Sequence, residues 1–423
     1  MPIREKFKNY LAKFRTLSFL QKFAVLFLIL FGVYYRPIEI QSGFGPQHIV
    51  LMALMIVLGV FIYGAPSRAL WIGILYCTWQ LITAFTLNDS IRWSTLFFSF
   101  GLVFTYVGFY NLVYHKKVFT IEIFIELLKF IMTLAFVFCI LQQMAILAGF
   151  RQLPAINMMM TYGKKGPLAC ASLYQEMSSF ARFMLVCFYG YVKCNEIKRG
   201  QGRYKFGELF KGEHRWVTIR FLWMMLTMGS GTAMIALLVF SLYFITKKNA
   251  VYMIPLFVVI YIMLGNIENK QLERSLHTLG ATATFDREAI IDADQSAAFR
   301  IVPVINSFSA DFSKKETWFG HGVDYGRNYK LVLRMRATLF DDYGVVLFLL
   351  GYVFAFSCAY KINSLGALFM ILGIGGGMAG NIQYAWELAM LMTVVRYFME
   401  QNEAKITKSK RITPTGFYAK NLY

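Results

Sequence analysis

The sequence has few charged residues: Asp, Glu, Lys and Arg make up 16% of its 423 residues, whereas 57% are hydrophobic. A soluble globular chain carries about 25% charged residues. Several apolar runs approach the roughly 20 residues that a helix needs to cross a bilayer. The shortage of charge therefore excludes an ordinary soluble domain and predicts an all-α, polytopic helical bundle in a membrane.

Acidic residues are the scarcer of the two charge types, with 23 Asp and Glu against 43 Lys and Arg, for a net charge of +20. The basic excess lies mostly in short loops and tails between apolar runs, as the positive-inside rule expects. A nucleic-acid-binding protein would gather it on a folded polar domain instead. The pattern excludes nucleic acid as a partner and predicts that the chain lies in a lipid bilayer.

Cysteine is also sparse, and no CxxC or mixed Cys/His spacing occurs, so the sequence predicts neither a metal site nor a bound cofactor. Five of the six cysteines fall in or at the ends of apolar segments. Only Cys170 lies in a predicted external loop. One cysteine there has no partner outside the membrane, so we expect no intrachain disulfide.

Familiar catalytic signatures are missing: the chain contains no HExxH, no GxSxG and no P-loop. No cleavable signal peptide is evident either, because the first apolar run continues to Tyr35 without a small-residue cleavage pattern. That run therefore reads as the first span.

The apolar runs predict about twelve transmembrane helices. They cover residues 17–35, 48–63, 69–85, 94–114, 130–149, 177–194, a hairpin within 217–246, and then 251–264, 343–360, 365–382 and 385–398. The hairpin is favoured because both flanks of 217–246 are basic, and Met228–Gly231 supplies a glycine-rich break. Alternating crossings place both termini in the cytoplasm.

This topology divides the chain into four parts. Residues 1–264 form a membrane bundle of nine spans with an external loop at 150–176, and residues 265–338 form one large external loop. Residues 339–402 supply the last three spans, and residues 403–423 are a basic cytoplasmic tail. The large loop holds most of the charge that does not belong to short basic loops.

Arg300 is the first candidate functional residue in the large loop. Asp294 or Ser296 can cap a helix that begins near Ala297, and Arg300 then projects about one turn into it. A guanidinium held there can bind phosphate oxygens of a lipid headgroup bidentately. The ordinary alternative is a salt bridge to Asp292 or Asp294.

The second half of the large loop is basic and includes Arg334 and Arg336. An excess of base on the outer side opposes the positive-inside tendency and indicates an anionic ligand, although a solvated charged surface is the default for any single residue. The turn Trp318–Gly322 adds His321, a general base near neutral pH or a structural histidine. Gly320 and Gly322 permit close backbone approach.

Glu176 stands at the start of a span, just after a loop that carries Lys165. An ionisable group at a membrane entrance is a functional candidate, and this carboxylate could take the proton from an attacking hydroxyl. It could equally pair with Arg182 or accept hydrogen bonds at the helix N-terminus.

Four segments, in this order, resemble the O-antigen polymerase and ligase superfamily, which are membrane glycosyltransferases of the Wzy type. They are Glu176–Ala181, Leu226–Ala233 with Ser230, Ser296–Arg300 followed by Trp318–Gly322, and Asp342–Gly351. The chain departs from the family at Gly231, where many members carry Arg, and at Leu333–Arg334, where ligases carry His. It also lacks the Pro that usually follows the residue matched by Glu176. The second departure favours a repeat-unit polymerase.

The resemblance implies a GT-C-like fold and metal-independent inverting transfer of a growing glycan from undecaprenyl pyrophosphate to a second lipid-linked repeat unit. It implies Glu176, His321 and Arg300 as catalytic residues and Arg300, Arg334, Arg336, Lys165 and Arg182 as pyrophosphate ligands. Ser230, Ser296, Gly320 and Gly322 would support them. A chain-length regulator protein is an implied partner, and the bacterial inner membrane is the implied location. The alternatives are an O-antigen ligase acting on lipid A core and a flippase for lipid-linked oligosaccharides.

Overall fold

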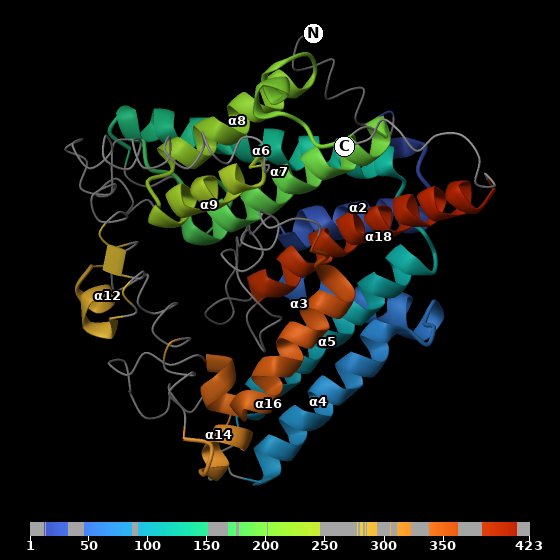
Figure 1. Cartoon of the computed structure of the whole chain (residues 1–423), viewed down its shortest axis with the longest axis vertical. Helices are drawn as coiled ribbons and strands as arrows, with labels where there is room; N and C mark the ends of the chain where they lie inside the picture. Colours follow the sequence, from blue (N-terminus) through green and yellow to red (C-terminus); the bar gives the residue numbers. More distant parts are fainter. Residues whose placement is uncertain are drawn as a thin grey trace.

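Helices make up the regular structure in the part of the chain that the computed structural model describes, and that part contains no strand (Figure 1). Besides a few single positions, the described residues are 14–32, 46–86, 92–150, 168–174, 177–200, 202–245, 286–293, 311–322, 338–362 and 383–412. The all-helical expectation is therefore confirmed for this part of the chain.

Four described helices are long and apolar enough to cross a membrane. They are α4 (Arg68–Thr86), α5 (Trp93–Tyr114), α6 (Ile121–Leu147) and the run Asp342–Ala359, formed by α16 (Thr338–Phe354) and the π-helix η4 (Ala355–Ala359). Three helices are apolar but shorter: α2 (Phe19–Gly32), α3 (Pro46–Ile56) with the π-helix η1 (Val57–Ile62), and α9 (Gly231–Leu242). The expected spans at 251–264 and 365–382 lie outside the described residues, so the count of twelve stays a prediction.

The remaining described helices carry more polar residues. They are α7 (Met177–Arg199), the short 3-10 helix η3 (Phe206–Phe210), α8 (His214–Thr227), α12 (Arg287–Ala293), α14 (Lys315–Phe319) and α18 (Gln383–Ile412). The predicted break in the hairpin is present, since α8 ends at Thr227 and α9 begins at Gly231.

Helix α6 begins nearer the N-terminus than the predicted span, which started at Phe130. Thr120 caps it, because the Thr120 side chain accepts a hydrogen bond of 3.3 Å from the backbone N–H of Ile123. The charged side chains of the added turns hide them from a reading based on hydropathy. Lys129 lies 3.5 Å from Glu126 and 3.1 Å from Glu213, so the added turns fasten α6 to the start of α8.

Contacts between helices fix their directions. Helix α5 runs antiparallel to α4, as Gln80 bonds Ser99 and Arg68 bonds Tyr110. It runs parallel to α18, as Tyr106 bonds Thr393 and Tyr114 bonds Glu400. Helices α6 and α8 likewise run parallel to each other and antiparallel to α7.

These directions give the bundle two ends. At the end we call the basic end lie the last turns of α5, α7 and η4, the long extension of α18, and the cations Arg68, Lys116, Lys117, Lys198, Arg199, Lys361 and Lys405. At the opposite end lie the last turns of α4, α6 and α8, the first turns of α7, α16 and α18, and α14.

Aromatic packing holds the centre of the bundle together. Tyr76 of α4, Tyr106 of α5, Phe354 of α16 and Trp386 of α18 are fully buried and meet with ring centroids 5.4–6.3 Å apart. Such pairs contribute about 0.5–1.5 kcal/mol each beyond their burial. Four helices distant in the sequence are thereby joined at one point.

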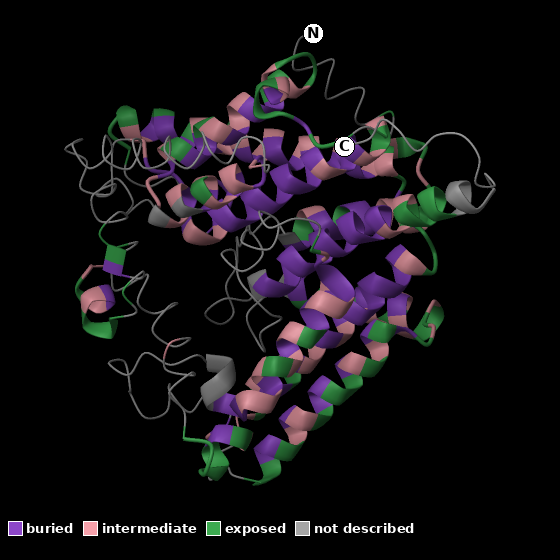
Figure 2. Ribbon diagram, viewed as in Figure 1, coloured by how far each residue is buried: buried purple, intermediate pink, exposed green. Residues whose placement is uncertain are grey.

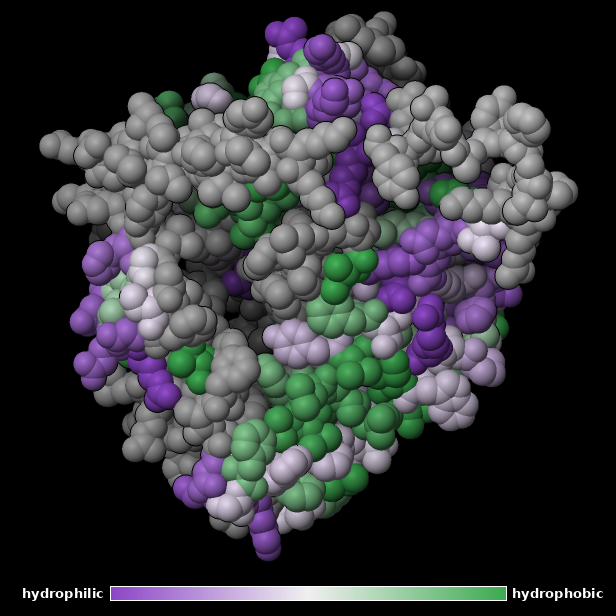
Figure 3. Space-filling model, viewed as in Figure 1, coloured by the Kyte–Doolittle hydropathy of each residue, from purple (hydrophilic) through white to green (hydrophobic). Residues whose placement is uncertain are grey.

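Burial is deepest along α5, α7 and the first half of α18 (Figure 2). Helix α4 instead exposes a row of large apolar side chains, among them Trp71, Leu75 and Phe85. The space-filling view shows hydrophobic residues gathered over α4 and α16 (Figure 3). An apolar exposed face of this kind is what a lipid-facing helix presents.

Candidate functional site

A short irregular segment at the opposite end, residues 168–174, is buried inside the bundle; we call it the strap. Ala169, Cys170, Ala171 and Ser172 are at most 1% exposed. Non-helical backbone at membrane depth has to be satisfied by protein groups, because lipid offers none. The strap leads into α7 and so sets where that helix begins.

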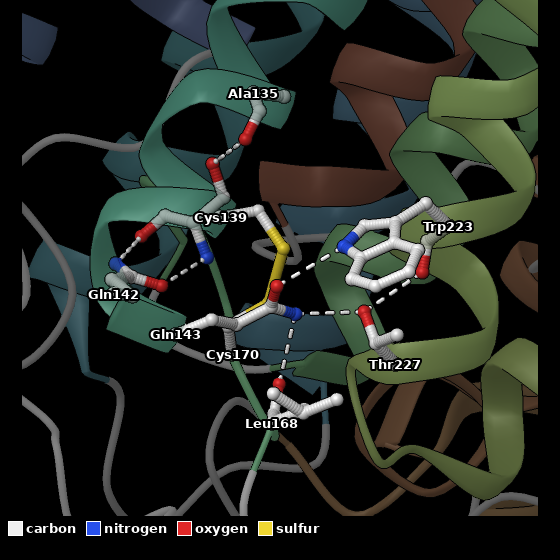
Figure 4. Close-up of a disulfide and its surroundings, with 9 residues drawn as sticks. Ala135, Cys139, Gln142, Gln143, Leu168, Cys170, Trp223 and Thr227 are labelled. Atoms are coloured by element: carbon white, nitrogen blue, oxygen red, sulfur yellow. Dashed lines mark hydrogen bonds between the residues drawn. A yellow bond between two sulfur atoms is a disulfide. The ribbon is translucent and has the colours of Figure 1, made fainter. Parts of the chain in front are cut away.

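Two neighbouring glutamines of α6 satisfy the strap (Figure 4). Gln142 accepts from the Ser172 N–H at 2.8 Å and donates to the Ser172 carbonyl at 2.5 Å. Gln143 donates to the Leu168 carbonyl at 3.0 Å and to Thr227 Oγ1 at 2.7 Å, and accepts from the Trp223 indole N–H at 3.1 Å. One side chain thus pairs the strap's backbone while the next ties it to the end of α8.

A disulfide joins Cys139 of α6 to Cys170 of the strap, with the two Cα atoms 5.8 Å apart (Figure 4). The expectation that Cys170 has no disulfide partner was therefore wrong. Cys139 belongs to a predicted span, but the strap turns back into the bundle and reaches its level. Because residues 150–176 were predicted to lie wholly outside the membrane, nothing in the sequence indicated that Cys170 is close to Cys139.

Replacing Gln142 by leucine is expected to lower the free energy of unfolding by about 2–6 kcal/mol. The change leaves a buried N–H and a buried carbonyl of Ser172 without their partner, and each such loss costs about 1–3 kcal/mol. Thermal unfolding of the purified protein measures it. Thr86→Val, which removes an exposed bond to the Ile82 carbonyl, is the control and should change little. Equal shifts for the two variants would contradict the role of Gln142.

Arg182 lies on α7 just beyond the strap and is 7% exposed. Helical spacing puts it on the same face as Tyr189 and Lys193, about two and three turns further along. Tyr189 packs edge-on against Tyr243, and Lys193 donates to the Tyr243 hydroxyl at 3.4 Å. Since Tyr243 directly follows α9, Arg182 lies on the side of α7 that faces α9, at the level of its first turns.

The first turns of α9 follow the predicted break. Gly229 has φ +70°, a conformation that favours glycine, and Ser230 is extended. The Ser230 carbonyl accepts from Ala233 N at 3.0 Å and so begins the helix. The turn with Ser230 and the face of α7 with Arg182 therefore lie at the same end of the same helix pair.

A second structure at the opposite end joins α14 to α16; we call it the clasp. Gly320 ends α14 at φ +79°, and Gly344 breaks the backbone of α16 at φ +77°. A Cβ on Gly320 would collide with the backbone of Asp342 and Tyr343, and one on Gly344 would collide with that of Trp318 and Phe319. Each glycine admits the other segment's main chain.

Hydrogen bonds and stacking fix the clasp on the bundle. Gly322 N donates to the Asp342 carbonyl at 3.0 Å. The Trp79 indole of α4 donates to the Tyr343 carbonyl at 3.2 Å, and its ring stacks on Phe319 at 5.4 Å. His321 is half-buried and lies between Gly320 and Gly322, which both contact the Asp342 main chain.

Glu387 is a buried carboxylate that sequence reasoning did not single out. It lies in the first turns of α18, is 2% exposed, and is within electrostatic range of Tyr174 in the strap. The signal was present, since an acidic residue inside the apolar run 385–398 is a functional candidate by default. It brings a carboxyl group close to the strap.

The basic end carries its own ionisable network. Glu196 is 4% exposed, lies 2.9 Å from Lys193, and accepts from the Tyr243 hydroxyl at 2.8 Å and from Tyr204 N at 3.0 Å. Nearby, His214 lies between the hydroxyls of Tyr191 and Tyr204, and burial lowers its pKa. These groups satisfy one another and join α7, α8 and α9, so the network reads as structural.

The structure describes five of the predicted site residues, in two separate places at the opposite end of the bundle. Gly320, His321 and Gly322 lie in the clasp, and Arg182 and Ser230 lie at the facing ends of α7 and α9. The other predicted site residues lie outside the described residues: Lys165, Glu176, Ser296, Arg300, Arg334 and Arg336. Among the described residues no group of His, Cys, Asp and Glu is arranged to hold a metal ion.

No protein-family model, curated protein or solved structure matches the chain.

Proposed function

We propose that the chain is a bacterial membrane polysaccharide polymerase. It transfers a growing glycan from undecaprenyl pyrophosphate to a lipid-linked oligosaccharide repeat unit. The observation that carries the proposal is the clasp. Trp318–Gly322 and Asp342–Gly344 belong to two segments of the family resemblance and are well separated in the sequence. Their main chains nevertheless pack directly against each other at Gly320 and Gly344.

Two independent features support the orientation that this reaction requires. The basic end belongs in the cytoplasm by the positive-inside rule. The disulfide lies at the opposite end, and disulfides form in oxidising compartments outside the cytoplasm. The described free cysteines, Cys77, Cys187, Cys194 and Cys358, are all buried. The proposal thus places the protein in the inner membrane, with both termini cytoplasmic and the clasp and strap on the outer side.

The proposed reaction is an inverting transfer. An acceptor hydroxyl oxygen attacks the anomeric carbon of the donor sugar while a base, Glu176 or His321, takes the hydroxyl proton. The bond between that carbon and the pyrophosphate oxygen breaks, and pyrophosphate leaves with the electron pair. The main requirement is cationic stabilisation of the leaving charge. Arg300 leads the proposed ligands, with Arg182, Arg334, Arg336 and Lys165.

Arg182 is the one of these cations that the structure describes, and its place supports its role. Many family members carry an arginine directly after the serine of the break, where this chain has Gly231. Arg182 lies on the facing side of α7, at the level of those turns. The Arg182 guanidinium can therefore supply, from α7, the positive charge that the arginine at position 231 supplies in those family members.

Replacing Arg182 by glutamine is expected to lower the polymerisation rate about 100-fold, the loss typical when one stabilising group is removed from a developing anion. Arg182→Lys should recover part of the rate, because it keeps the charge but not the bidentate geometry. Arg220→Gln is the control, since Arg220 donates to Thr133 at 2.8 Å elsewhere in the bundle. Rates come from initial glycan extension, with thermal unfolding to confirm folding. An unchanged rate in Arg182→Gln would remove Arg182 from the site.

Reconstitution with purified lipid-linked repeat units tests the function itself. Polymerase activity predicts a ladder of lipid-linked products with pyrophosphate carrier released, and Arg300→Ala should abolish the ladder. Supplying lipid A core as a second acceptor identifies a ligase, which would transfer glycan to the core and build no ladder.

A flippase is the non-enzymatic alternative. Substrate offered only on the outer face of proteoliposomes separates the two, because a polymerase extends chains there and a flippase does not. Movement of lipid-linked substrate across the bilayer without chain extension would overturn the proposed function.

A further inference from the structure

Two aromatic rings stand exposed on the polar segment around α14. Phe312 is 52% exposed and Trp318 is 44% exposed, and their rings meet edge to face with centroids 5.8 Å apart. Trp318 lies on α14, which leads into the clasp. The next residue, Phe319, stacks on Trp79 and so packs α14 on the bundle.

The ring pair is held in one orientation. The Trp318 indole N–H donates to the Phe312 carbonyl at 2.9 Å, and the Thr317 hydroxyl donates to the Asp311 carbonyl at 2.6 Å. The Asp311 carboxylate accepts from both the backbone N–H and the hydroxyl of Ser313, at 3.0 and 2.6 Å. The clasp anchors the other end of α14. Preorganised rings of this kind lose little entropy when they bind a ligand.

Exposed polar side chains surround the rings, namely Asp311, Ser313, Lys314, Lys315 and Glu316. Hydrogen bonds from Ser313 lower the pKa of Asp311, so the carboxylate stays ionised and accepts hydrogen bonds. Apolar faces rimmed by fixed donors and acceptors suit a ligand that is itself apolar on one face and polar at its edge. A pyranose ring is such a ligand, because C–H groups line its face and hydroxyls its rim.

We propose that Phe312 and Trp318 form a glycan-binding platform, on which a sugar residue of the polysaccharide stacks beside the clasp. The platform rests on the proposed function for its place in a polymerase, where it would hold the chain near His321. Its ligand class is a neutral or amino-sugar oligosaccharide of pyranose rings.

Membrane anchoring is the competing use of exposed aromatic rings. Phe85 at the end of α4 and Trp93 and Phe97 at the start of α5 are also exposed, and the Trp93 ring contacts the other two. They lie on long apolar helices, as an anchor should. Trp318 lies instead on a short helix with charged neighbours, which favours the aqueous, sugar-facing role and makes Trp93 a matched control.

Saturation-transfer NMR on the full chain in nanodiscs tests the platform, with chitotetraose, maltohexaose and a galactose tetramer as probes. At least one probe should receive saturation on the C–H protons of one ring face. Trp318→Ala should weaken its binding about tenfold, the effect of one stacking pair. Trp318→Phe should retain most of it, and Trp93→Ala should leave it unchanged. Thermal unfolding of each variant separates loss of the ring from loss of fold.

The outcomes separate the platform from the proposed function. Binding lost in Trp318→Ala, with no polymerisation by the wild-type protein, keeps the platform and overturns the polymerase. Polymerisation with product length and probe binding unaffected by Trp318→Ala overturns the platform alone. Saturation of none of the probes also overturns the platform. Brominated lipid gives a second test: if it quenches the tryptophan fluorescence of the wild-type protein more than that of Trp318→Phe, the platform is overturned and the Trp318 ring lies in the membrane.

Discussion

Replacing Gly344 by alanine is expected to lower the free energy of unfolding of the clasp by about 4 kcal/mol and to remove most transfer activity. Two costs add. The backbone at φ +77° is strained for any residue with a Cβ, by about 1–3 kcal/mol. The new Cβ also collides with the carbonyl of Trp318, and overpacking costs about 1–3 kcal/mol more. Main chain cannot move aside as a flexible side chain would.

Gly200→Ala isolates the second cost. Gly200 has φ +65°, close to that of Gly344, but nothing lies within 4 Å of a Cβ placed there. The free energy of unfolding of Gly200→Ala should fall only by the cost of the backbone strain, so the difference between the two variants gives the cost of the collision. Hydrogen exchange of the Gly322 N–H, which bonds the Asp342 carbonyl, reports opening of the clasp directly. Slow exchange in Gly344→Ala would show that the clasp remains closed, against expectation.

The prediction extends to activity because His321 lies between Gly320 and Gly322, which both contact the Asp342 main chain. Opening the clasp would release the segment that carries His321 from α16, and small misplacements of a catalytic group cost large factors in rate. If His321 is instead only structural, a clasp variant will lose stability but keep its rate per folded molecule. The comparison therefore also decides between the two roles that the sequence left open for His321.

Hydropathy and loop charge predicted much of the helical framework. The start of α7 at Met177 and the break between α8 and α9 follow directly from apolar length and from glycines between two basic flanks. The start of α6 could not be found in this way, because its first turns carry Glu122, Glu126 and Lys129. Thr120 is a residue type that commonly caps helices and could have indicated this start, but the charged residues that follow it led to a later predicted start.

The candidate site divides along a similar line. The glycines of the clasp were readable, since Gly320 and Gly322 flank a histidine and glycine permits close approach. The sequence did not indicate which main chain approaches these glycines, because the contacting segment, Asp342–Gly344, belongs to the next predicted span. The strap was missed for a related reason: burial of residues 168–174 depends on two glutamines of α6, and a polar residue in an apolar run carries no mark of its partner.

Removing the disulfide is the second large expected effect. A double replacement of Cys139 and Cys170 by serine should lower the free energy of unfolding by about 4 kcal/mol, the loop-entropy value for a sequence separation of 31. Activity should fall with it, because the strap leads into α7, which carries Arg182. Thermal unfolding and initial rates of the same preparations measure both.

Cys77→Ser and Cys358→Ser supply the controls, as these cysteines are buried and free. They should lose only the packing of one side chain. Alkylation of denatured, unreduced protein gives an independent readout: Cys139 and Cys170 should stay unlabelled while the four free cysteines react. Labelling of all six would mean that the natural chain lacks the bond. It would also remove one of the two features that support the proposed outer location of the strap, the other being the basic end.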